Sequence, residues 1–152
     1  SSGRNVALKQ NAVQSSTFTC DDLGGFLASN AVDGNTNGSV ASHSCTNTDT
    51  RDPSPSWTVT FGHPQLVNRF VLYNRVGHER LKNFTLESLD YENTTVFSYQ
   101  DSSVTALTVY TVTVPGRLRG SPVSLLQINA TVLANEDSNP VLTLCEFEAY
   151  GG

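Results

Sequence analysis

Short segments rich in Val, Thr, Leu, Phe and Tyr recur along this chain, with turn-forming clusters such as FGHPQ between them. The segments span residues 56–61, 67–73, 83–89, 104–114, 123–130 and 142–150. Several alternate apolar with polar residues, most clearly TVYTVTV and LCEFEAY, and a period of two is typical of strands with one buried face. No segment of useful length shows the helical period. The pattern predicts an all-β fold, either a sandwich or a jelly roll.

Length and charge limit the function classes. The chain has 152 residues, which suits one domain with one core over residues 1–152, with 1–3 and 151–152 as its edges. Charged residues make up 15% and the net charge is −5, which argues against a nucleic-acid-binding or anionic-membrane surface. No apolar run is long enough to cross a bilayer, so we expect no direct membrane insertion.

Sequons and cysteines indicate the compartment. Four Asn-x-Ser/Thr sequences occur in this Ser- and Thr-rich chain, at Asn37, Asn83, Asn93 and Asn129. Together they favour a secreted or extracellular glycoprotein, although Ser/Thr-rich chains also generate such sequences by chance. The three cysteines, Cys20, Cys45 and Cys145, fit one disulfide with one cysteine left over.

The segment SNAVDGNTNG is a candidate metal loop. It places Asn30, Asp33 and Asn35 within six residues, next to Gly34. Hard cations take several oxygens from a tight loop, and such side chains with turn carbonyls supply them. The spacing differs from that of an EF-hand loop. The alternative is a cluster of Asx turns held by side-chain hydrogen bonds.

A disulfide between Cys45 and Cys145 would bear on this loop. It would join the long Ser/Thr/Asn-rich loop to the last strand-like segment, and would bring Glu146 beside Ser44 and the DGN turn. A carboxylate from the far end of the chain would then complete an oxygen cage. On that condition the sequence favours a calcium site.

Two arginines share the short segment NRVGHERLKNF. The guanidinium groups of Arg75 and Arg80 offer planar forks of donors that can each hold two oxygens, as vicinal sugar hydroxyls present them. With a His or Asn opposite, the pair can clasp a monosaccharide. The alternative is that both are surface charges, with Glu79 as a weak partner.

Catalytic patterns do not stand out. The sequence lacks G-x-S-x-G, H-E-x-x-H and C-x-x-C, and its adjacent carboxylates (Asp21 with Asp22, Glu146 with Glu148) do not by themselves define a cleft. We expect no catalytic residues and no enzymatic activity. Trp57 and His63 have ordinary explanations, in the core and in a turn respectively.

Six motifs occur in a fixed order along nearly the whole chain. They are NVALKQNAVQSS (5–16), ASNAVDGN (28–35), SCTNT (44–48), SWTVTFG (56–62), NRVGHER (74–80) and LCEFEAY (144–150). Together they resemble the F-type lectin (fucolectin) family, within the wider group of discoidin and coagulation factor 5/8 C-type domains. The first two motifs belong to the wider group, and the SCT, arginine and LCE motifs are more specific to the lectins. The resemblance implies a galactose-binding-domain-like jelly roll that binds fucose near a structural calcium.

The resemblance also assigns residues. Cys45 and Cys145 match the family disulfide, and Arg75 and Arg80 match the arginines that hydrogen-bond the sugar. The positions that match the calcium ligands are Asn30, Asp33, Asn35, Ser44 and Glu146. The chain departs from the family where Asn47 replaces a His, and where RVGHER is two residues shorter and lacks an Asp and two cysteines. We expect Asn47, His43 or His78 to complete the sugar site.

The resemblance therefore implies a secreted, calcium-stabilised lectin domain that recognises terminal L-fucose on glycans or glycoproteins. Its role would lie in cell recognition, adhesion or innate immunity. A single such domain binds weakly, so oligomers or tandem domains are expected to add avidity. The alternative is a discoidin-like interaction module that binds a protein or a non-fucose glycan.

Overall fold

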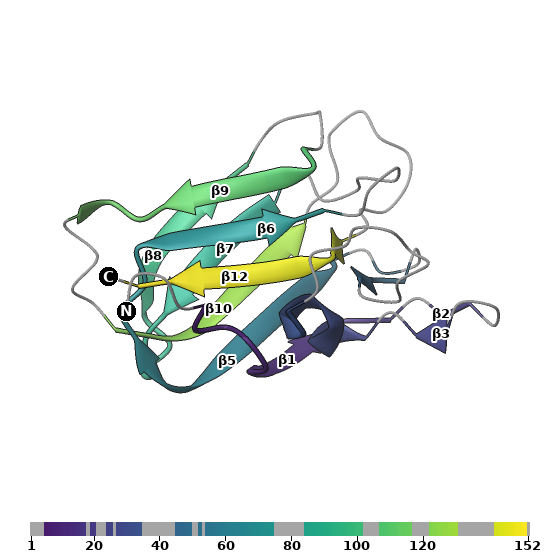
Figure 1. The fold of residues 1–152 in the computed structure, drawn as a ribbon, viewed down its shortest axis with the longest axis horizontal. Coiled ribbons are helices and arrows are strands. Elements are labelled where there is room, and N and C mark those ends of the chain that lie inside the picture. The colour runs from purple at the N-terminus through teal and green to yellow at the C-terminus, as the bar shows by residue number, and fades with distance from the viewer. Residues whose placement is uncertain are drawn as a thin grey trace.

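The computed structural model describes residues 5–17, 19–20, 24–25, 27–34, 45–49, 52, 54–74, 84–101, 107–116, 122–130 and 142–151. Within these ranges two antiparallel sheets face each other (Figure 1). The larger sheet has the order β1-β5-β10-β7-β8, with strands Asn11–Gln14, Ser56–Gln65, Val123–Ala130, Phe84–Leu89 and Thr95–Gln100. The smaller has the order β12-β6-β9, with strands Glu146–Tyr150, Arg69–Tyr73 and Val109–Thr113.

Shorter elements complete the described fold. β2 (Thr19–Cys20) pairs with β3 (Gly24–Gly25), and β11 (Thr143–Leu144) pairs with β4 (Thr46–Asn47). A 3-10 helix, η1, spans Ala28–Val32. The described helical segment is far too short and too polar to cross a membrane. The arrangement confirms the predicted all-β, jelly-roll sandwich.

The core lies between the two sheets. It is built from the residues of each strand that point inward, which are every second residue along the strand. In β9 the exposed and buried residues alternate strictly, and β7 alternates buried with half-buried positions. Fully buried aromatic rings join the layers: Trp57 lies 5.3 Å from Phe147, and Phe147 lies 5.8 Å from Phe70, between ring centroids. The Trp57 indole N–H donates to the Ala28 carbonyl at 3.0 Å, which ties η1 to the core. The prediction that Trp57 is a core residue is confirmed.

The strand boundaries differ from the sequence prediction in one instructive place. The cluster FGHPQ was predicted as a turn, but β5 continues through it to Gln65, so His63 is a strand residue. β1 pairs with β5 only at residues 57–60, so the stretch beyond has an open edge in the described structure. Pro64, which lacks an N–H, is tolerated at such an edge. Among the longer strands, β1 and β8 were not predicted because their alternation is weak, and the two-residue strands β2, β3 and β4 were not predicted either.

The last predicted segment is divided. Residues 143–144 pair with β4, whereas residues 146–150 pair with β6, and Cys145 lies at the switch. Its N–H donates to the Tyr73 carbonyl at 2.7 Å. The chain therefore changes partner within one residue, which period-two alternation does not reveal.

The sandwich has two ends, which we name by their residues. β5 runs from Ser56, which pairs with Asn129, to Gln65, which pairs with Val123, and the short link 66–68 returns the chain into β6. Tyr73, Glu146 and Cys145 therefore lie at the Ser56 end, here called the disulfide end. Gln65, Arg69 and Tyr150 lie at the other, here called the terminus end because Asn5 bridges to Tyr150 there.

Candidate functional site

A disulfide joins Cys45, just before β4, to Cys145, between β11 and β12. Both residues are buried, and 100 positions separate them in the sequence. The predicted pairing is confirmed. Closing a loop of this size stabilises the fold by about 4–5 kcal/mol in the chain-entropy model. The bridge joins Cys45 to the residue directly before Glu146, which is the first residue of β12.

Glu146 is a fully buried carboxyl group at this end. Its Oε2 accepts a hydrogen bond from the Gly34 N–H at 2.9 Å, and it also shares a hydrogen bond with the Asp33 carboxyl group. Its Oε1 is buried without a hydrogen-bond partner among the described residues. Burial, opposed by the Gly34 N–H and reinforced by the nearby Asp33 charge, raises the pKa of Glu146 to about 9.

The turn after η1 delivers Asp33 and Gly34 to Glu146. Gly34 has a positive φ of 90°, a conformation that glycine adopts at little cost, and a Cβ there would lie 3.1 Å from the Leu8 Cδ1. Asn30, in η1, donates its Nδ2 to the Cys45 carbonyl at 3.1 Å. Three segments far apart in sequence thus meet at the disulfide.

This arrangement fits a hard cation. Carboxylate, amide and carbonyl oxygens are the ligands that calcium takes, and a buried carboxylate oxygen without a partner is costly unless a cation or proton compensates it. Asn30, Asp33 and Glu146 are brought together as predicted, whereas Asn35 and Ser44 lie outside the described residues. No group of three or more His, Cys, Asp or Glu side chains occurs in the described ranges, so a cation here would depend on amide and carbonyl oxygens as well.

Asn47, the residue in place of the family His, is almost fully buried in β4, with 3% of its surface exposed. Its Nδ2 donates to the Thr48 carbonyl at 2.9 Å, while Oδ1 has no partner among the described residues. Thr46 Oγ1, on the same short strand, is equally without a partner there. Three buried side-chain atoms without a hydrogen-bond partner in the described part of the chain therefore lie together at the disulfide end: Thr46 Oγ1, Asn47 Oδ1 and Glu146 Oε1. Such atoms mark a place that a ligand or ion can complete.

Sequence reasoning missed Asn74, which supports the base of the arginine segment. It is buried, accepts a 2.7 Å hydrogen bond from the Thr143 hydroxyl on Oδ1, and donates from Nδ2 to the Leu107 carbonyl at 3.0 Å. Thr143 pairs in turn with Asn47. The signal that could have identified it is its position, since it directly follows the predicted strand and precedes Arg75.

The remaining predicted sugar ligands, Arg75, Arg80, His43 and His78, lie outside the described residues. The structure does place the described residues that flank the arginine segment. Asn74 follows β6, and Phe84 begins β7, and both lie at the disulfide end. The segment that carries Arg75 and Arg80 therefore leaves and re-enters the sandwich at the end that holds Glu146 and Asn47.

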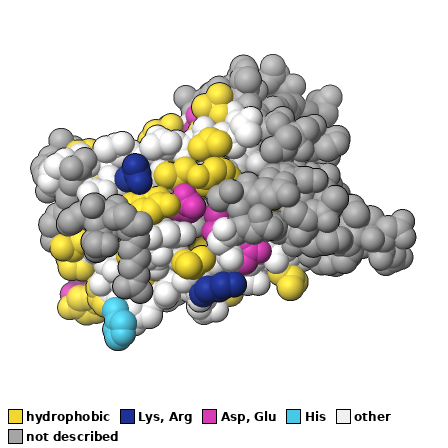
Figure 2. All heavy atoms as spheres, viewed as in Figure 1, with side chains coloured by type: hydrophobic (Ala, Val, Ile, Leu, Met, Phe, Trp, Pro, Cys, Tyr) yellow, Lys and Arg dark blue, Asp and Glu magenta, His cyan; other side chains and the backbone are white. Residues whose placement is uncertain are grey.

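The outer face of the smaller sheet holds β12 in register. The hydroxyls of Tyr73 and Tyr150 each donate a hydrogen bond to the Glu148 carboxylate, and Arg69 lies over the Tyr150 ring, 4.6 Å from its centroid. Burial, together with Glu148, raises the pKa of Tyr150 to about 12. Figure 2 shows acidic side chains running across the middle of this face between apolar ones. The cluster fixes the strand whose first residue is Glu146.

The sequons differ in their settings. Asn93 is exposed at the turn between β7 and β8, with a positive φ of 62°, whereas Asn129 is half-buried within β10, between β5 and β7. Asn37 and Asn83 lie outside the described residues. The backbone of Cys20, the third cysteine, pairs with Gly24.

Known proteins share this sequence pattern and this fold. Residues 30–124 match the family model described as NedA-like, galactose-binding domain. No curated protein sequence matches the chain. A fucose-binding module from Streptococcus pneumoniae is 26% identical with a TM-score of 0.80, and 98% of each chain is covered.

Two further structures are similar over nearly all of this chain. The lectin domain of lectinolysin, solved in complex with Lewis B antigen, is 25% identical with a TM-score of 0.82, covering 100% of this chain and 99% of that one. A fucolectin from striped bass (Morone saxatilis) serum is 27% identical with a TM-score of 0.76, covering 97% of this chain and 48% of that one.

Proposed function

Because the chain belongs to the NedA-like, galactose-binding domain family of F5/F8 type C domains, we propose that it is a non-catalytic lectin domain that binds terminal L-fucose on glycans. The observation that carries the proposal is that several motifs lie at one end of the sandwich. Motifs from four separate parts of the chain meet at the disulfide end or flank it, and fucose-binding modules have the same fold over the same length.

Calcium is part of the proposal. Glu146, Asp33 and Asn30 would hold the ion together with main-chain carbonyls, and Asn35 and Ser44 would add ligands from their neighbouring segments. The partnerless Glu146 Oε1 supports this assignment, because an ionised carboxylate in that position needs a cation beside it. The ion would neutralise the buried acidic pair and hold the η1 turn against β12. The sugar would be bound by side chains rather than by the metal.

The sugar would lie beyond the calcium cage, on the arginine segment. Arg75 and Arg80 would each present two parallel N–H donors to vicinal hydroxyls and the ring oxygen. Asn47 has one uncommitted acceptor, Oδ1, and can take one hydroxyl hydrogen bond from the sugar or support a side chain that does. His43 and His78 are the candidates for the contact that the family His makes elsewhere.

An extracellular location fits this function. Structural disulfides such as Cys45–Cys145 form and persist mainly in oxidising compartments, and Asn93 is an exposed sequon. A role in cell recognition, adhesion or innate immunity follows from fucose binding, and tandem copies or oligomers would add avidity to a weak single site.

A glycan array tests the proposal. We expect the purified domain to bind fucosylated glycans, to lose binding in excess chelator, and to lose it in the variants Arg75→Ala and Arg80→Ala. Arg69→Ala is the matched control, because Arg69 lies at the terminus end over Tyr150. A blank array would refute fucose recognition. Binding that survives both arginine substitutions would refute the site.

A second candidate is a discoidin-like module that binds a protein or a non-fucose glycan. It is favoured by one observation, the burial of Asn47 with its amide committed to Thr48, where a longer His would reach outward. In that case Asn47→His would gain fucose binding that the parent chain lacks.

A further inference from the structure

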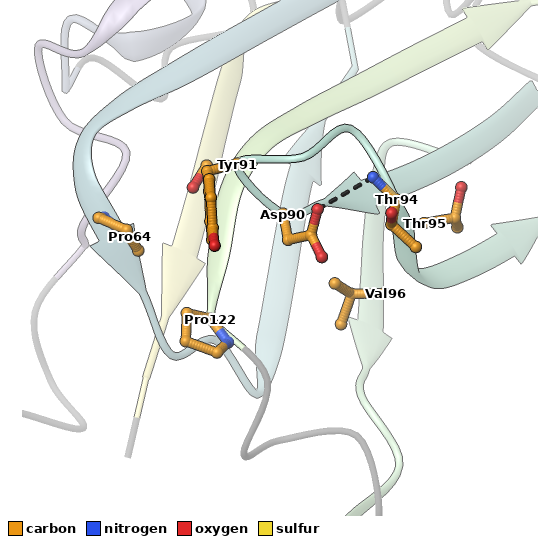
Figure 3. A pocket seen from close by; sticks show the side chains of 8 residues that line it. Pro64, Asp90, Tyr91, Thr94, Thr95, Val96 and Pro122 are labelled. Carbon is orange, nitrogen blue, oxygen red and sulfur yellow. Dashed lines mark hydrogen bonds between the residues drawn. The ribbon is translucent and has the colours of Figure 1, made fainter.

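A hollow lies at the terminus end, away from the disulfide. It has a volume of about 500 Å³ and opens between the end of β5, the β7–β8 turn and the start of β10. In Figure 3, Tyr91 lies between Pro64 and Asp90, with Pro122 below it. Pro64 is the residue before the last residue of β5, and Pro122 directly precedes β10. The hollow is therefore separated from Glu146 by the length of the sandwich.

The turn that carries Tyr91 is held by its own hydrogen bonds. Asp90 Oδ1 accepts from the N–H groups of Glu92 at 2.9 Å and Thr94 at 3.0 Å. The Asp90 N–H donates to the Thr94 carbonyl, and the Asn93 N–H donates to the Asp90 carbonyl, both at 3.0 Å. Asn93 adopts a positive φ, as the last residue of such a turn requires. Tyr91 is thus presented on a preorganised hairpin.

The Tyr91 ring and the Asp90 Oδ2 are available to contact a ligand. The Tyr91 side chain is 78% exposed, and no hydrogen bond or ring contact to another described residue engages it. Asp90 uses only Oδ1 in the turn, and its Oδ2 is uncommitted within the described structure. The two groups therefore offer a flat apolar surface and a charged acceptor side by side at the hollow.

We propose that this hollow, the Tyr91 pocket, is a second sugar-binding site that takes a neutral pyranose ring. The ring's C–H face would lie on Tyr91, with Pro64 and Pro122 as apolar walls, and Asp90 Oδ2 would accept hydrogen bonds from its hydroxyls. Sites of this kind are mostly apolar with a few placed polar groups, and the hydroxyls of Thr94 and Ser124 supply more. The volume suits one or two rings.

Charge narrows the ligand class. Among the residues that the structure describes, the lining contains one carboxylate and no Lys or Arg, and Glu92 is exposed on the same turn. A sugar acid would meet repulsion from Asp90, and no described lining residue supplies a compensating cation. The pocket selects against uronic and sialic acids. Its described lining residues lie at the end opposite the proposed calcium ligands, so we expect sugar binding there to be independent of the proposed calcium ion and fucose site.

The test is protein-observed NMR on the parent chain made in a host that attaches no N-glycans. Methyl α-galactoside, methyl α-fucoside and N-acetylglucosamine are titrated in excess chelator, with glucuronic acid as the anionic comparison. We expect the neutral sugars to shift the Tyr91 resonances and glucuronic acid not to. Tyr91→Ala is expected to weaken binding about tenfold, as truncation of an aromatic anchor typically does.

Two charge variants form a matched pair. Asp90→Asn keeps the turn acceptor Oδ1 but replaces the charged Oδ2, and is expected to weaken binding several-fold. Glu92→Gln removes a neighbouring charge outside the lining, and is expected to leave binding unchanged. The proposal is overturned if no neutral sugar shifts Tyr91 at tens of millimolar, or if Tyr91→Ala binds as the parent does. Arg75→Ala removes the proposed fucose site only, so failure of one site is distinguishable from failure of the other.

A sugar in the pocket could also come from an N-glycan attached to Asn93, because this sequon is two residues from Tyr91. Protein secreted from a eukaryotic host, with the Asn93 glycan verified by mass spectrometry, separates the two sources. If the tethered glycan fills the pocket, free sugars no longer shift Tyr91, and Tyr91→Ala changes the resonances of the attached sugar. If an external glycan is the ligand, free sugars still bind.

Discussion

The two ends of the sandwich differ in how far their polar groups are satisfied by hydrogen bonds within the protein. The disulfide end gathers residues from opposite parts of the sequence, and it leaves Glu146, Thr46 and Asn47 each with a buried polar atom that no described residue satisfies. The terminus end builds its hollow largely from one hairpin, whose turn bonds are complete, and leaves an aromatic ring in solvent.

A bound ligand is therefore expected to affect the stability of the fold at one end and not at the other. At the disulfide end a bound cation would stabilise the fold itself, because it would compensate a carboxyl group that burial otherwise keeps protonated. At the terminus end a bound sugar would add contacts to a turn that is already formed, so its removal would leave stability nearly unchanged. The following substitutions test this contrast.

The largest effect is expected from the disulfide. Replacing both Cys45 and Cys145 by Ala should lower the free energy of unfolding by about 4–5 kcal/mol, because the unfolded chain regains the freedom of a closed loop of this size. Urea denaturation followed by tryptophan fluorescence measures it, since Trp57 is buried beside Phe147. Cys20→Ser is the matched control and should be neutral. Equal stability of the double variant and the parent would contradict a structural role for the bridge.

The next effect is the pH dependence of the calcium-free protein. The Glu146 pKa is raised from 4.5 to about 9 in the folded state, so the folded protein retains a proton that the unfolded chain releases. Stability is therefore greatest below pH 4.5 for this group, and falls as the pH rises towards 9. In chelator we expect the melting temperature to fall by several degrees between pH 5 and pH 9, at about 2–4 °C per kcal/mol.

Calcium should reverse this loss at high pH, because the ionised carboxylate is the form that binds a cation. Glu146→Gln should remove both the pH slope and the calcium response, while Glu92→Gln, an exposed carboxylate at the other end, should change neither. Differential scanning calorimetry with and without calcium measures all three proteins. A flat profile for the parent in chelator would rule out a buried, protonated Glu146.

The last effect is expected at the terminus end. Gly151 is buried, and a Cβ on it would overlap the Leu66 carbonyl. Gly151→Ala should therefore cost about 1–3 kcal/mol, as overpacking does, and leave fucose binding intact. Gly116→Ala is the control, because a Cβ there meets no atom within 4 Å. If both alanine variants melted alike, the tight packing of Gly151 against Leu66 would be disproved.

Much of the fold followed from alternation, and the places where it failed have physical causes. β7, β9 and β10 were predicted within a few residues because each presents one apolar face. β5 was ended too early at FGHPQ, because Pro64 is acceptable only where the neighbouring edge is open, and edge position is a tertiary property. For the site, resemblance paired Cys45 with Cys145 and brought Glu146 to Asp33, but it gave no sign that Asn47 would be buried.

By itself the sequence determined the all-β class, because the period of its apolar residues requires strands with one buried face. It also determined which chemical groups are present: two neighbouring arginines, an Asx-rich turn and a carboxylate beside a cysteine. Only the tertiary structure decided what those groups become. Burial decides that Glu146 holds a proton when no cation lies beside it and that Asn47 keeps one free acceptor, and exposure makes Tyr91 available to a ligand. Solvation depends on neighbours from distant parts of the chain, and local sequence does not encode it.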